Sequence, residues 1–153
     1  ILQPISGAKK IIIDAVNGSE TIPTANDVFA WIDTDFKNWG AAETGPATPA
    51  VPTSVYEMAQ NATFTQMFGS FSSDLEKLCL TQAQIKRFCV GHRKYLRTDG
   101  CATFFLFESK NTIFVAGVRL RSGGALYARV YQFENSRVWY AENRHRVVVP
   151  QLA

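Results

Sequence analysis

The fold is decided by residues 102–134, which read ATFFLFESKNTIFVAGVRLRSGGALYARVYQFE. Apolar residues in this stretch recur with the short period that is typical of strands. We identify three strand candidates here, at 102–108, 112–121 and 125–134. The loops between them are too short for a crossover, so these strands are predicted to be antiparallel neighbours. Two further candidates, 137–142 and 146–149, extend the prediction to a meander of four to five strands.

The preceding part of the chain is predicted to be mostly helical. One strand is expected over 9–16, around the Ile11–Ile13 run. A helix is expected where Val28, Trp31 and Ile32 share one helical face, and another from Ser54, with Glu57 completing a capping box. Two more helices are predicted at 64–68 and 81–97, and the Pro/Ala/Thr-rich residues 40–53 are predicted to be an extended linker.

The helix predicted over 81–97 has the clearest pattern. Thr81 and Gln84 match a capping box. Apolar or weakly polar residues recur every three to four positions and are expected to face the core: Ile85, Phe88, Cys89, His92 and Leu96. Together these patterns predict a single α+β domain over residues 1–153: an N-terminal strand and helices, then a C-terminal antiparallel β-meander with the helices packed on one face.

Charge divides the chain into two halves. Residues 1–76 carry three basic and nine acidic groups, a net charge of −6, whereas residues 77–153 carry 13 basic and four acidic groups, a net charge of +9. Such a division indicates either that the acidic and basic halves attract each other or that the basic half meets an anionic partner.

The basic groups gather on one face of the predicted meander. If residues 122–124 form a three-residue loop with Gly124 left-handed, Arg121 lies opposite Ala125 and Arg119 opposite Tyr127. If a second hairpin follows, Tyr131 faces Trp139. One face is then predicted to carry Arg119, Arg121, Tyr127, Arg129, Tyr131, Phe133, Arg137 and Trp139.

Arginines interleaved with aromatic rings are typical of surfaces that bind single-stranded nucleic acid. The same pattern also occurs on solvated sheet faces, where arginine stems simply pack on rings. We therefore expect a non-enzymatic domain for an anionic partner, nucleic acid or an acidic protein, with single-stranded nucleic acid favoured. One alternative is a structural or protein-interaction module in which the acidic half of one copy pairs with the basic half of another.

Catalytic and cofactor motifs do not stand out. An enzyme alternative is a thiol-dependent hydrolase that uses Cys101 or Cys89 with His145, but the prediction is no catalytic residue, no cofactor and no metal site. Three cysteines without a CxxC motif favour reduced thiols and an intracellular location. No apolar run approaches the ~20 residues that span a bilayer. Because Ile1 opens the chain without Met or a signal-peptide pattern, excision from a longer product is an open alternative.

Overall fold

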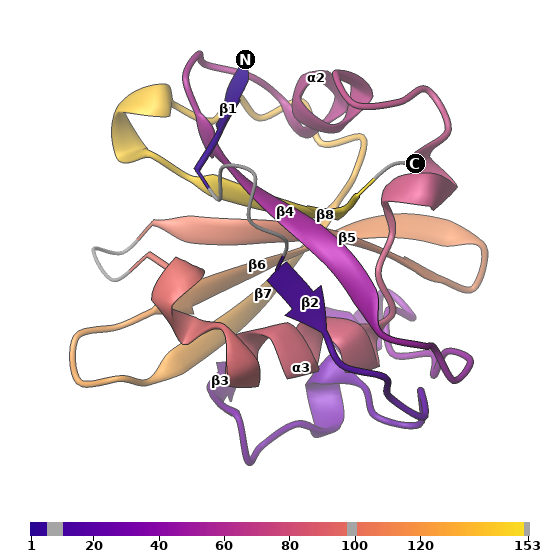
Figure 1. Ribbon diagram of the computed structural model, residues 1–153. Coiled ribbons are helices and arrows are strands. Elements are labelled where there is room, and N and C mark those ends of the chain that lie inside the picture. Colours follow the sequence, from indigo (N-terminus) through magenta and orange to yellow (C-terminus); the bar gives the residue numbers. More distant parts are fainter. Residues whose placement is uncertain (6–10, 98–100, 152–153) are drawn as a thin grey trace.

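An eight-stranded mixed sheet forms the centre of the computed structural model, which describes residues 1–5, 11–97 and 101–151 (Figure 1). The strands are β1 (Leu2–Pro4), β2 (Ile11–Ile13), β3 (Phe29–Ile32), β4 (Val51–Met58), β5 (Ala102–Ser109), β6 (Thr112–Leu120), β7 (Leu126–Gln132) and β8 (Arg146–Pro150). Their order in the sheet is β1-β4-β8-β5-β6-β7-β3, and β2 also pairs with β4. The α-helices are α1 (Asp35–Asn38), α2 (Phe64–Gly69) and α3 (Gln82–Gly91), and the 3₁₀ turns are η1 (Ile22–Thr24), η2 (Leu75–Leu78), η3 (Arg93–Tyr95) and η4 (Ala141–Asn143). The α+β class is as predicted.

The predicted meander is present for three strands, β5, β6 and β7, which are consecutive antiparallel neighbours. The predicted register of the hairpin that turns at residues 122–124 is also confirmed. The amide of Arg121 donates to the carbonyl of Ala125 at 2.8 Å, and Arg119 pairs with Tyr127. Gly124 has the expected left-handed backbone, with φ +92°.

The meander ends at β7, so the prediction of a strand at 137–142 was wrong. This segment runs as a loop that makes one isolated bridge, between Trp139 and Ala62. The next strand, β8, does not follow its predecessor in the sheet but lies between β4 and β5, antiparallel to β4 and parallel to β5. The outer edge of β7 instead receives β3 in parallel.

Two predicted helices are strands. The segment that contains Trp31 forms β3, and the segment that begins near Ser54 forms β4, which pairs with β1 and β2 on one edge and with β8 on the other. Pairing on both edges satisfies the backbone of β4 more completely than a capping box would, because a short helix leaves several amides and carbonyls unpaired. The 40–53 linker prediction holds only up to Ala50, since β4 begins at Val51. Within the predicted 9–16 strand, only Ile11–Ile13 is a strand in the described part of the chain.

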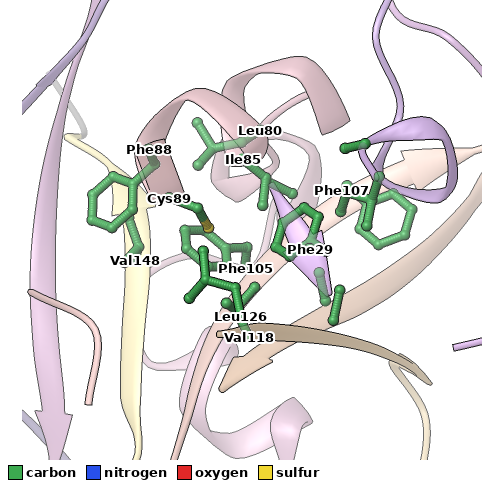
Figure 2. Close-up of a cluster of buried hydrophobic side chains, with 14 of the residues drawn as sticks. Phe29, Leu80, Ile85, Phe88, Cys89, Phe105, Phe107, Val118, Leu126 and Val148 are labelled. Carbon is green, nitrogen blue, oxygen red and sulfur yellow. The ribbon is translucent and has the colours of Figure 1, made fainter. Parts of the chain in front are cut away.

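The helices pack on both faces of the sheet, not on one as predicted, because successive residues of β5 alternate between two cores. Phe105 faces the first core, which lies under α3 (Figure 2). Phe104 faces the second core, which lies under α2 on the opposite side of the sheet (Figure 1). The central strands carry apolar residues on both faces, so the sheet is the middle of three layers.

Of the predicted helix caps, the one at Thr81 is confirmed, and Thr63 is a cap that the sequence reasoning did not predict. Thr81 caps α3 and forms the expected capping box with Gln84, and Thr63 caps α2 in the same way with Gln66. Helix α3 ends at Gly91, earlier than the predicted Arg97, and the chain continues into η3. The predicted core residues Ile85, Phe88, Cys89 and Leu96 are all buried, whereas His92 is partly exposed.

Candidate anion-binding surface

The sheet face that carries arginines and aromatic rings is formed by β6 and β7. Arg119 of β6 and Tyr127 of β7 are direct partners in the ladder. Arg129 and Tyr131 follow Tyr127 at two-residue intervals, so strand alternation places them on the same face. We call this surface, with Arg121, Arg137 and Trp139, the arginine–aromatic face. Arg137 and Trp139 were predicted to lie on a strand, but they reach this face from the loop after β7.

Helix α2 divides the arginine–aromatic face into a covered and an open part. The ring of Phe64 lies 5.6 Å from the ring of Tyr131 and 5.3 Å from that of Trp139, measured between centroids. Trp139 is only 2% exposed, and its Nε1 donor finds no acceptor among the described residues. Trp139 and much of Tyr131 therefore belong to the second core and are not available as a stacking surface.

The open part lies where β3 borders β7, and we call Trp31, Arg121, Tyr127 and Arg129 the outer platform. Its two rings are neighbours, with 6.1 Å between the centroids of Trp31 and Tyr127. Each ring has a guanidinium group over it: Arg121 is 4.7 Å from the Tyr127 centroid, and Arg129 is 5.1 Å from that of Trp31. Trp31 is 40% exposed, so the platform is accessible to solvent.

Trp31 is the residue that sequence reasoning missed. Its segment was interpreted as a helix, which placed Trp31 on a core-facing stripe and away from the arginines. The signal that could have found it is the local sequence Phe29–Ile32, which is short and rich in aromatic and branched residues, as strands are.

Arg119 and Arg137 lie toward the covered part of the face. The Arg137 guanidinium is 3.9 Å from the centroid of Trp139 and is exposed to solvent. Arg119 is partly exposed, and its charge acts on the neighbouring His145. Burial, first, and the positive charge of Arg119, second, lower the pKa of His145 to about 4. The imidazole is thus neutral at pH 7, and its Nδ1 accepts a hydrogen bond from the amide of Ala102 at 3.0 Å.

Ion pairs join the acidic first half of the chain to the basic second half. Every ion pair in the described part of the chain joins an acidic residue of the first half to a basic residue of the second. Lys86 contacts Glu20 and Asp27, Arg87 contacts Asp14, and Arg97 and Arg146 both contact Glu57. The two halves therefore attract each other within one molecule, as one of the two expectations proposed.

These ion pairs leave the outer platform uncovered. Within residues 1–5, 11–97 and 101–151, no ion pair involves Arg121, Arg129 or Arg137, whose guanidinium groups lie over rings. An arginine over a ring keeps its full charge and its donors, whereas an arginine bound to a carboxylate is neutralised. The outer platform is consequently a site of unneutralised positive charge.

Of the two cysteines of the thiol-hydrolase alternative, Cys89 lies on the other side of the sheet from His145. Cys89 lies in the first core, and burial raises the pKa of its thiol to about 12. His145 contacts Phe104 and Trp139, which lie in the second core on the other side of the sheet. Cys101 immediately precedes Ala102, whose amide occupies Nδ1 of His145, so that nitrogen is not free to accept a thiol proton.

Comparisons with known proteins place this chain in no family: no family model, no curated protein and no solved structure matches it. Within the described residues, no group of three or more His, Cys, Asp or Glu side chains could hold a metal ion. None of the helices over that same part of the chain has the length and apolar character needed to cross a membrane.

Proposed function

We propose that this protein is a non-enzymatic binding domain for an anionic partner, with single-stranded nucleic acid favoured, and that the outer platform is its contact surface. The observation that carries the proposal is that Arg121 and Arg129 lie over rings and not against carboxylates: Arg121 over the partly exposed ring of Tyr127, and Arg129 over the exposed ring of Trp31. Positive groups without a carboxylate partner attract phosphate, and adjacent rings offer stacking surfaces.

A single strand suits the outer platform better than a duplex does. Bases of a single strand are unpaired, so they can lie on aromatic side chains, and each stacked base contributes ~1–3 kcal/mol. The guanidinium groups that cover the rings would move aside onto neighbouring phosphates, because a charge-assisted contact to phosphate is stronger than an exposed cation–π contact. Two rings at 6.1 Å offer stacking positions for one or two bases.

The other arginines would extend the contact beyond the two rings. Arg119 lies directly opposite Tyr127 in the ladder, and Arg137 lies exposed over Trp139. Phosphates of a strand that crosses the platform along β7 would pass these groups. Neutralising three or four phosphates releases bound counterions, so the affinity is expected to fall steeply as salt rises.

The test is a salt titration of oligonucleotide binding, with poly-dT and poly-rU oligomers followed by fluorescence anisotropy. Arg129→Ala should weaken binding and lower the salt slope by about one contact, whereas Tyr127→Ala should weaken binding with little change in slope. Arg87→Ala is the matched control, because Arg87 is an exposed arginine on α3 that pairs with Asp14.

Two results would contradict the proposal. One is that neither oligomer binds at ~50 mM salt, where electrostatic affinity is strong. The other is an equal loss for Arg87→Ala and Arg129→Ala, which would indicate attraction by net charge without a defined surface.

A further inference from the structure

A concave surface lies at the end of the sheet, away from the outer platform. It is a groove of about 590 Å³, bounded by Trp39 after α1, by Leu75 of η2, and by the start of β6 and the end of β7. The groove is lined by Trp39, Leu75, Asn111, Thr112, Ile113, Phe114, Gln132, Phe133 and Glu134. Its volume falls within the range of small-molecule sites, which combine apolar walls with a few polar groups.

The groove has one charged side chain, and it is acidic. Glu134 is the only ionisable residue of the lining, and it makes no ion pair or side-chain hydrogen bond in the described part of the chain. Lys110, the neighbour of Asn111 in sequence, lies over Gly40 and does not line the groove. In a protein whose second half is strongly basic, this groove is therefore a local site of negative charge.

Three aromatic residues stand in the same lining. Trp39 is 39% exposed, while Phe114 and Phe133 are almost fully buried. The face of an aromatic ring attracts a cation, and it does so most strongly in tryptophan. A carboxylate and an exposed indole in one groove are the two groups that stabilise an organic ammonium ion.

We propose that this groove binds a small organic cation with an ammonium head group, held between the indole of Trp39 and the carboxylate of Glu134. The negative charge of Glu134 favours a cationic ligand over an anionic or a neutral one. An anionic ligand would meet Glu134 without any lining cation to offset the repulsion, and a neutral apolar ligand would bury the carboxylate without a partner. The groove is proposed to bind a cation, whereas the outer platform is proposed to bind an anion. The two proposals are therefore independent of each other.

Choline is a suitable probe, because 3,3-dimethyl-1-butanol has the same shape and lacks the charge. Binding of each is measured by isothermal titration calorimetry, together with quenching of tryptophan fluorescence. Choline should bind at least about fivefold more tightly than the neutral alcohol, as the sum of the cation–π and ion-pair contributions indicates. Glu134→Gln should reduce choline affinity by about two- to fivefold and leave the alcohol unaffected.

The tryptophan variants locate the ligand. Trp39→Ala should reduce choline affinity by about fivefold or more, whereas Trp31→Ala, which removes the other half-exposed tryptophan, should leave it unchanged. Thermal melting confirms that each variant is folded. The proposal is overturned if choline does not bind, if the neutral alcohol binds as tightly, or if Trp31→Ala weakens choline binding as much as Trp39→Ala does.

Discussion

The buried imidazole of His145 should make the stability of the protein fall between pH 6.5 and pH 4. His145 is 4% exposed, its Nδ1 accepts the amide of Ala102, and its ring packs against Phe104 and Trp139. Protonation would put a charge into this core and would break the hydrogen bond to Ala102, because a protonated Nδ1 cannot accept. Burial and the nearby Arg119 accordingly hold the pKa at about 4 in the folded protein, against an ordinary value of 6.5.

The magnitude follows from the difference between the folded and unfolded pKa values. Between pH 6.5 and 4 the unfolded chain binds a proton that the folded protein does not, so stability is complete above pH 6.5 and decreases as the pH falls toward 4. Each unit of difference corresponds to about 1.4 kcal/mol, so the loss from this one group is at most about 3.5 kcal/mol. Below pH 4 the contribution of His145 to the pH dependence ends.

Urea denaturation at several pH values tests this prediction. His145→Asn removes the titrating group while offering a side-chain oxygen to the amide of Ala102, and carboxylates that titrate in the same range contribute equally to both proteins. Wild type should lose about 2–3 kcal/mol more than His145→Asn between pH 7 and pH 4. His92→Asn keeps His145 and should retain the wild-type loss. Equal pH dependence of wild type and His145→Asn would refute the reasoning.

Three further substitutions test the fold. Phe88→Ala leaves a cavity in the first core beside the Phe105 ring and should lower the free energy of unfolding by about 3–5 kcal/mol. A decrease below about 1 kcal/mol in denaturant melts would mean that the buried face of α3 is misassigned. Thr81→Ala removes the α3 cap and should cost about 1 kcal/mol, with Thr81→Ser close to wild type as the contrasting result. Gly18→Ala should lower the melting temperature strongly, because Gly18 has φ +85° and an added Cβ would lie 2.1 Å from the carbonyl oxygen of Pro46. A melting temperature equal to that of wild type would show that this turn has another conformation.

The parts of the fold that the sequence predicts well are those determined by neighbours along the chain. The β5–β6–β7 meander and its register follow from strand alternation and short loops, and the capping box of α3 follows from residues three apart. Strand β4 was misread because Ser54 and Glu57 match a helix cap locally, while its pairing partners lie far away in sequence, in β1, β2 and β8. Long-range pairing therefore overrides a local helix signal in this segment.

The candidate surface was predicted only where it depends on residues that are close together in the sequence. The hairpin register placed Arg119 and Arg121 near Tyr127 correctly, since only one short loop intervenes. Trp139 was assigned to a strand on the open face, but it is buried against Phe64 of α2, a contact between residues 75 positions apart that no local pattern encodes. The parallel pairing of β3 with β7, which brings Trp31 to the platform, is equally remote in sequence.

The position of β8 has a consequence for the order in which the sheet is assembled during synthesis. β8 joins β4 to β5, yet the ribosome makes it after every other strand of the sheet. Until it emerges, the β1–β2–β4 portion and the β5–β6–β7–β3 portion have no common ladder, and each keeps an open edge that other chains could pair with. Premature termination before Arg146 should therefore leave two unjoined sheets that aggregate, whereas completion of five residues, Arg146–Pro150, closes them into one.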